Sequence, residues 1–386
     1  MGSIYFLVIP LLTFLAYRLF GVARPPTQVA YTAEPNHTTL LLCLLVLLTV
    51  ALVWVLSNRP LAGRPQNGQS LSVPKFLRWM FFYFLIVEIA NIFLIDRNVH
   101  WLESHHNYFV PDIIQFLMHP FQWFSWAIAI IIVCGGKADL GLNHRIAWLI
   151  SAIFLALAVA NSGNRILIAL TFLFFYAYSS PTRQKQILLC SPIIALLGFY
   201  ISTYVLAARV NVSHEAILAY YGGHDAISSL ISAVNLITEA LNAVVFQTIF
   251  EDYWRNPEIQ YGILRAFVTL IPGYSPVETF NIEIGKVYAP GVGMSLNSTI
   301  YGYFVYAFGI LGFPLLALCM IGFCQIEWYA NDPLIEKIMF VVVLAAVRFG
   351  LEYLIYCSLY IVLTILILRV FSPEKSDRAT KAIHGG

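Results

Sequence analysis

Long apolar runs separated by short polar segments extend through almost the whole chain. Each run holds roughly 15 to 25 residues, the length range of a helix that crosses the hydrocarbon core of a bilayer. The runs begin near Ile4, Leu40, Trp79, Tyr108, Ile146, Ile166, Ile187, Leu296, Ile338 and Tyr353. A backbone inside lipid must satisfy its own polar groups, which favours helices. The pattern predicts an all-α polytopic integral membrane protein with about ten spans.

The composition of the chain excludes an ordinary water-soluble enzyme. Of 386 residues, 60% are hydrophobic and only 11% are charged, whereas a soluble domain carries about a quarter charged residues. The formal net charge of +2 gives no indication of a nucleic-acid partner. The six cysteines lie in or beside apolar runs without disulfide or zinc spacing, so we expect neither a metal nor another cofactor.

Lysine and arginine alternate along the chain in a way that predicts its orientation. Short loops rich in these residues prefer the cytoplasm. The basic residues of the second, fourth and sixth predicted loops and of the tail are Arg59, Arg64, Lys75, Arg78, Lys137, Arg145, Arg183, Lys185, Lys375, Arg378 and Lys381. We therefore expect both termini in the cytoplasm and the remaining loops outside. The run near Ile4 lacks a basic leader and a cleavage pattern, so we interpret it as a retained span and not as a signal peptide.

These spans predict four regions along the chain. They are an N-terminal bundle of about seven helices at 1–207, a large outward-facing loop at 208–295, a C-terminal bundle of about three helices at 296–371, and a cytoplasmic tail at 372–386. In the loop, apolar residues recur at helical spacing from Ile227 to Ile249, which predicts an amphipathic helix that lies on the membrane or caps a cavity. An eleventh span here is the alternative, and it would place the basic tail outside.

Arginine strongly outnumbers lysine on the predicted outer side. The outward basic residues are Arg18, Arg24, Arg97, Arg165, Arg209, Arg255, Arg265, Lys286 and Arg348. The guanidinium group is a planar fork that binds phosphate with two hydrogen bonds and stays charged. This set therefore indicates an anionic, lipid-linked ligand such as a phosphate or pyrophosphate. The alternative is that each arginine pairs with a nearby acid or extends to the membrane interface.

Arg165 carries the clearest signal within this set. It follows a glycine turn and begins a very apolar helix, so it lies at a helix N-terminus, where backbone donors and the helix dipole attract an anion. Arg348 lies at the predicted outer end of the ninth span. Glu352, one turn later, offers it an ion pair as the alternative.

Four motifs follow one another from Asn161 onward. They are the turn Asn161–Arg165, the segment Arg265–Pro272, the stretch Gly291–Thr299 that leads into Tyr303 and Phe308–Gly312, and the segment Arg348–Glu352. Their order, with the long loop among them, resembles that of the Wzy-type oligosaccharide repeat-unit polymerases, including those of O-antigen and enterobacterial common antigen. Over the first half of the chain the resemblance is one of hydropathy alone.

The resemblance implies a GT-C-like, metal-independent and inverting glycosyltransferase in a bacterial inner membrane. The growing glycan would pass from undecaprenyl pyrophosphate to a new lipid-linked repeat unit at the periplasmic face, and a chain-length regulator would be a partner. The resemblance also implies that Arg165 and Arg265, with Arg209 and Arg348, hold the pyrophosphates. Tyr303, in the matched segment, is a further expected substrate contact.

A transfer of this kind needs cations for the leaving group and a base for the acceptor hydroxyl. The candidate bases in the loop are His214, Glu251 and Asp252. Arg255 lies one turn after the acidic pair, so solvated charges with an i,i+4 ion pair are the alternative. Tyr274 belongs to a group of loop aromatics whose flat faces suit sugar rings or, equally, a membrane interface.

Glu88 lies in the middle of the third predicted span, which makes it a functional candidate, with a hydrogen bond to Asn91 or to another helix as the alternative. Two other functions stay open. An O-antigen ligase or a polyprenyl-linked-sugar glycosyltransferase would use the same chemistry. A lipid-linked oligosaccharide flippase or transporter would line a cavity with charges along several spans, whereas charge within the spans here is nearly confined to Glu88.

Overall fold

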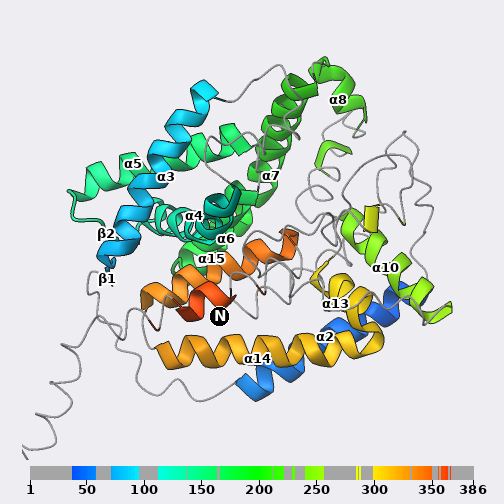
Figure 1. The fold of residues 1–386 in the computed structure, drawn as a ribbon. Coiled ribbons are helices and arrows are strands. Elements are labelled where there is room, and N and C mark those ends of the chain that lie inside the picture. The colour runs from blue at the N-terminus through cyan, green and yellow to red at the C-terminus, as the bar shows by residue number, and fades with distance from the viewer. Residues whose placement is uncertain are drawn as a thin grey trace, which may run out of the picture.

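The computed structural model is mostly helical over the residues that it describes (Figure 1). These residues are 37–57, 71–94, 112–136, 138–162, 166–210, 212–220, 228–230, 240–255, 284–285, 287, 299–330, 333–349, 355, 358–363 and 366. The predicted first span near Ile4 and the predicted tail lie outside them, and the predicted span near Tyr353 is described only in part.

Each predicted span from Leu40 to Ile338 coincides with a helix. The helices are α2 (His37–Ser57), α3 (Lys75–Leu94), α4 (Asp112–Val133), α5 (His144–Ser162), α6 (Ile166–Ala177), α7 (Pro181–Val210), α13 (Ile300–Phe308), α14 (Gly312–Ala330) and α15 (Pro333–Phe349). In the described part of the chain, four helical stretches are long and apolar enough to cross a membrane: His37–Leu56, Lys75–Phe93, His144–Asn161 and Ile300–Gln325. An all-α protein with several membrane-crossing helices is therefore supported, and a total of about ten spans stays a prediction.

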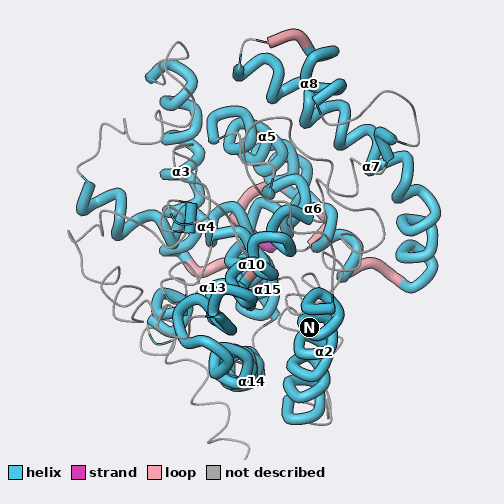
Figure 2. Tube along the Cα trace, turned by 90° about the vertical axis from the view of Figure 1, so that its right-hand side faces the viewer, coloured by secondary structure: helices cyan, strands magenta, loops and turns pink. Residues whose placement is uncertain are grey.

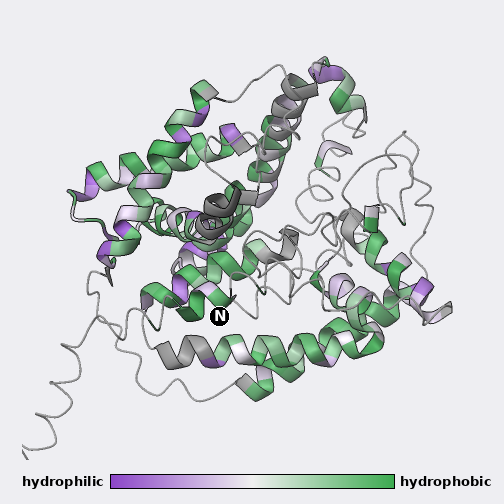
Figure 3. Cartoon of the chain, in the orientation of Figure 1, coloured by the Kyte–Doolittle hydropathy of each residue, from purple (hydrophilic) through white to green (hydrophobic). Residues whose placement is uncertain are grey.

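Helix α2 shows why these helices require lipid. Its buried residues recur every three or four positions and face α14: Thr39, Leu42, Val46, Thr49 and Val53. The opposite face exposes leucines, of which Leu40 and Leu48 are 61% and 65% exposed. A helix that is apolar all round and buried on one side only is stable when its other side contacts hydrocarbon. Figure 3 shows the hydrophobic colour extending along α2 and α14.

Two helices form the centre of the bundle. Every residue of α4 from Trp123 to Ile132 is buried, as is every residue of α15 from Ile338 to Ala345. Helix α4 packs against α3, α5, α6 and α15, while α2 packs against α14 at the lower edge of the molecule in both views (Figure 2). Helices of the predicted N-terminal and C-terminal bundles therefore share a common core, because neither set buries its apolar surface alone.

One end of the bundle is marked by a short parallel strand pair. Strand β1 (Leu71–Ser72) pairs with β2 (Ala138–Asp139). Arg78 joins the same end: its Nε donates to the carbonyl oxygen of Val73 at 2.8 Å, and its Nη2 lies 3.8 Å from Asp139 Oδ2. The second and fourth predicted loops therefore meet, as loops on one side of a membrane can. Which side this is stays a prediction.

The motif Phe308–Gly312 forms a tight break between α13 and α14. The 3₁₀ turn η2 (Gly309–Leu311) begins at Gly309, whose φ of +62° lies in the left-handed region that favours glycine. A Cβ atom on Gly309 would overlap the ring of Tyr253, and one on Gly312 would overlap the backbone of Phe304. Both glycines thus make space for close packing, which gives this motif a structural role.

We expect Gly309→Ala to lower the free energy of unfolding by about 1–3 kcal/mol, since alanine disfavours this φ and its methyl group displaces Tyr253. Thermal unfolding in detergent, followed by size-exclusion chromatography, measures the change. The control is Gly322→Ala in α14, where a Cβ meets no described atom within 4 Å. Equal stability of the two variants would show that the break does not depend on Gly309.

Candidate functional site

Helix α10 (Ala240–Arg255) carries two of the predicted bases, and part of it is buried inside the protein. The predicted amphipathic helix was Ile227–Ile249; α10 begins later and extends to Arg255, and residues 231–239 lie outside the described part of the chain. Residues Ala243–Gln247 are buried on every side because α10 packs against α2 and α13. Over these turns α10 is not a helix that lies on the membrane surface.

A chain of polar groups runs from α2 into α10. The Thr39 hydroxyl donates to Gln247 Oε1 at 2.5 Å, and Gln247 Nε2 donates to Glu251 Oε1 at 3.0 Å. Thr39 and Gln247 are fully buried, whereas Glu251 is half-buried. The partly exposed Glu251 carboxylate is therefore held by Gln247, which is itself held by Thr39, and both of these side chains are fully buried.

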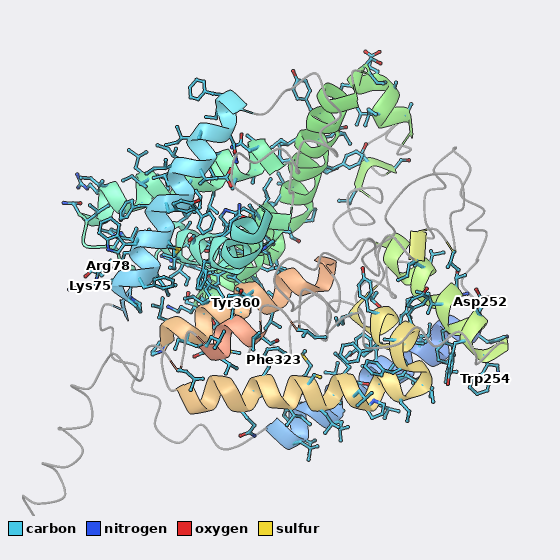
Figure 4. The ribbon with its side chains drawn as sticks, in the orientation of Figure 1. Lys75, Arg78, Asp252, Trp254, Phe323 and Tyr360 are labelled. Carbon is cyan, nitrogen blue, oxygen red and sulfur yellow. The ribbon has the colours of Figure 1, made fainter. Side chains whose placement is uncertain are left out.

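The last turn of α10 places other chemical groups beside Glu251. Asp252 is half-buried, and Tyr253 packs over Gly309 of the break between α13 and α14. Trp254 is 71% exposed and its ring stacks on Phe250, with 6.2 Å between the ring centroids. Figure 4 shows Asp252 and Trp254 at the outer end of α10, projecting away from the bundle. An oriented carboxylate, a second acid and an exposed flat ring thus occupy one helix end.

His214 lies at a different place. It begins α8 (His214–Tyr220), which packs against α7, and both views show α8 far above α10. Its Nε2 is 3.0 Å from Thr203 Oγ1, whose proton is directed to the helix carbonyl oxygens of Phe199 and Tyr200. Nε2 and the Thr203 hydroxyl therefore share a hydrogen bond between α8 and α7. The ring of His214 also packs edge-on against Tyr204, so its contacts join α8 to α7.

Glu88 is the centre of a second buried network. It is 2% exposed, and Asn161 Nδ2 donates both to its carboxylate at 2.9 Å and to its backbone carbonyl at 2.7 Å. Gln122 Nε2 donates to the carboxylate at 3.3 Å, and Asn91 also hydrogen-bonds to it. Helices α3, α4 and α5 therefore meet at Glu88, and the expected alternative of a bond to another helix is present. Asn161 is the first residue of the turn that was predicted to precede an anion site.

The predicted phosphate-binding arginines are not brought together by any described contact. Arg165, Arg265 and Tyr274 lie outside the described residues. Arg209, Arg255 and Arg348 lie near the ends of α7, α10 and α15, with backbone positions described and side chains not described. The arginine site stays a prediction.

Tyr303 is fully buried within α13. Its position in the core gives it no surface for a ligand in this conformation of the protein. Within the described residues, no group of three or more His, Cys, Asp or Glu side chains could hold a metal ion.

Sequence reasoning missed Thr39 and Gln247. The spacing of Gln247 and Glu251, four residues apart on a helix, could have indicated their hydrogen bond. Thr39 gave no such signal, because 208 positions separate it from Gln247. The link between Glu88 and Asn161, 73 positions apart, was hidden for the same reason.

No protein-family model, no curated protein and no solved structure matches this chain.

We expect Glu88→Ala to lower the free energy of unfolding by about 2 kcal/mol or more, because it removes the carboxylate that accepts from the buried amide of Asn161 and the half-buried amide of Gln122. Thermal unfolding in detergent measures the loss. Glu215→Ala, which removes an exposed carboxylate on α8, should change stability by less than about 0.5 kcal/mol.

The combination of Glu88→Ala with Asn161→Ala tests the pairing itself. If the two side chains act as one unit, the double variant loses less stability than the sum of the single losses. Additive losses would mean that the two residues stabilise the protein independently.

Proposed function

We propose that the chain is a polysaccharide repeat-unit polymerase of a bacterial inner membrane. It transfers the growing glycan from undecaprenyl pyrophosphate onto a new lipid-linked repeat unit at the periplasmic face. The observation that carries the proposal is the packing of the motif Phe308–Gly312 against the acidic end of α10, through the contact of Gly309 with Tyr253. The Wzy-like motif series thus meets Tyr253, which lies two residues after the candidate base Glu251, although 56 positions of sequence separate Tyr253 from Gly309.

The proposed reaction is a single displacement, which inverts the anomeric centre. The acceptor hydroxyl of the incoming unit forms a bond to the anomeric carbon of the growing glycan, and the bond from that carbon to the pyrophosphate oxygen breaks. Glu251 takes the hydroxyl proton, since general-base catalysis needs a positioned acceptor within hydrogen-bond reach. Undecaprenyl pyrophosphate leaves with its charge, which arginines of the predicted outer set stabilise without a metal ion.

The arrangement of the helices supports an outward-facing site. Helix α10 contacts the first turn of α2 through Gln247 and the turn before α14 through Tyr253, so α2 and α14 run in the same direction. The predicted topology likewise gives α2 and α14, its second and eighth spans, the same direction across the membrane. Figure 1 shows β1 and β2 on the opposite side of the molecule from α10. With the basic loops in the cytoplasm, the end of α10 faces the periplasm.

A flippase or transporter of lipid-linked oligosaccharides is the second candidate. Glu88 favours it, because a carboxyl group buried among membrane helices is typical of sites that couple transport to an ion. An O-antigen ligase shares the proposed chemistry and differs in its acceptor.

Deletion of the gene, followed by gel analysis of the surface polysaccharide, separates these functions. A polymerase deletion leaves the lipid core capped with one repeat unit. A ligase deletion leaves uncapped core, and a flippase deletion leaves uncapped core with the lipid-linked unit trapped on the inner face. Either of the last two results would refute the polymerase proposal.

Glu251→Gln should slow polymer formation by about 10²-fold or more, since it removes the proton acceptor. Asp252→Asn is the matched control, because Asp252 neighbours Glu251 on the same helix turn and the bond from Gln247 goes to Glu251. Polymer length and amount in the complemented deletion strain, at equal protein level, measure both. Normal polymer with Glu251→Gln would exclude Glu251 as the base.

A further inference from the structure

We infer that Thr39 and Gln247 are positioning residues, which fix the Glu251 carboxylate in the orientation that the reaction requires. The inference rests on the proposed function and adds two residues that neither touch the substrate nor belong to any recognised motif. It also gives α2, a helix of the first half of the chain, a part in the site.

The chemistry of the three groups sets the direction of the hydrogen bonds. An ionised carboxylate only accepts, so the amide nitrogen of Gln247 must face Glu251. The amide oxygen of Gln247 then faces α2, where an acceptor needs a donor, and the Thr39 hydroxyl supplies it. The donor on α2 therefore determines which end of the Gln247 amide points to the reacting group.

The surroundings of the hydrogen-bonded series Thr39–Gln247–Glu251 indicate that packing alone does not explain why these polar residues are there. Residues Ala243–Phe246, which precede Gln247 on α10, are apolar and buried, and so are Leu42 and Val46, which follow Thr39 in the buried stripe of α2. Two apolar side chains of similar volume would fill the same seam without the cost of removing polar groups from water. A fully connected polar chain that ends on a surface-reaching carboxylate instead restricts the orientation of that carboxylate.

The same helix provides a matched comparison. Thr49 is also buried in the stripe of α2 that faces α14, but its hydroxyl donates to the carbonyl oxygen of Leu45 in its own helix, at 2.8 Å. Thr39→Val and Thr49→Val therefore make the same chemical change on the same buried face. Of these two substitutions, Thr39→Val is the one that breaks the connection to Gln247.

The experiment measures steady-state kinetics of the full-length protein in lipid nanodiscs, with lipid-linked repeat units extracted from the deletion strain as substrate. Thr39→Val and Gln247→Leu should each lower kcat about tenfold or more at similar KM, because a reacting group misplaced by about 1 Å can lose about 10²-fold in rate. Thr39→Ser, which keeps the hydroxyl, and Thr49→Val should keep kcat near that of the unmodified protein.

The double variant Thr39→Val with Gln247→Leu distinguishes a positioning role from a purely structural one. If both residues act through Glu251, its kcat falls no further than that of Gln247→Leu alone. Size-exclusion chromatography confirms folding, and Gln247→Met is used if Gln247→Leu does not fold.

Several outcomes would overturn the positioning role while the proposed function stands. They are full kcat with Thr39→Val, equal losses with Thr39→Val and Thr49→Val, failure of Thr39→Ser to restore the rate, and multiplied losses in the double variant. Absence of polymer from the folded, unmodified protein would instead overturn the proposed function and the inference with it.

Discussion

A polar side chain that is removed from water must find a partner, and this constraint determines which helices of the protein are joined and where. The lipid-facing surfaces of α2 and α3 are apolar and interchangeable, so they do not define a unique arrangement. The few buried polar groups do. Glu88 connects α3 to α4 and α5, and Thr39 connects α2 to α10 and, through Gln247, to Glu251. Each connection costs stability if one partner is lost, because the other then loses a hydrogen bond inside the protein.

Much of the helical framework could be predicted from the sequence, because a run of apolar residues long enough to cross a bilayer has few other ways to satisfy its backbone. The packing of those helices could not be predicted, since one face of a leucine-rich helix resembles another. Periodicity left open whether the predicted amphipathic helix lies on the membrane or caps a cavity, and Gln247 counted among its polar positions; in the structure Gln247 is buried and bonds to a threonine 208 positions away. Helical periodicity does not distinguish a water-facing polar residue from a buried, partnered one.

The candidate site was anticipated in its residue types and only partly in its geometry. In the described structure Glu251 accepts a hydrogen bond from the buried Gln247, whereas the Nε2 of His214 hydrogen-bonds to Thr203 and joins α8 to α7. The Phe308–Gly312 motif was one of the segments on which the resemblance to the Wzy-type polymerases rests, with no role assigned to its glycines. In the structure these glycines let Tyr253 and Phe304 pack closely. A motif can thus define a site by shaping the backbone beside the reacting group.

The proposed polymerase must have the acidic end of α10 and the paired strands on opposite sides of the membrane, because a flipped lipid-linked glycan would reach it from outside. Labelling with a membrane-impermeant maleimide tests this most directly, using Trp254→Cys and Asp139→Cys in a background without the native cysteines. We expect Trp254→Cys to be labelled in intact cells and Asp139→Cys only after permeabilisation. Labelling of both positions from the same side, or of Asp139→Cys alone in intact cells, would contradict the proposed function.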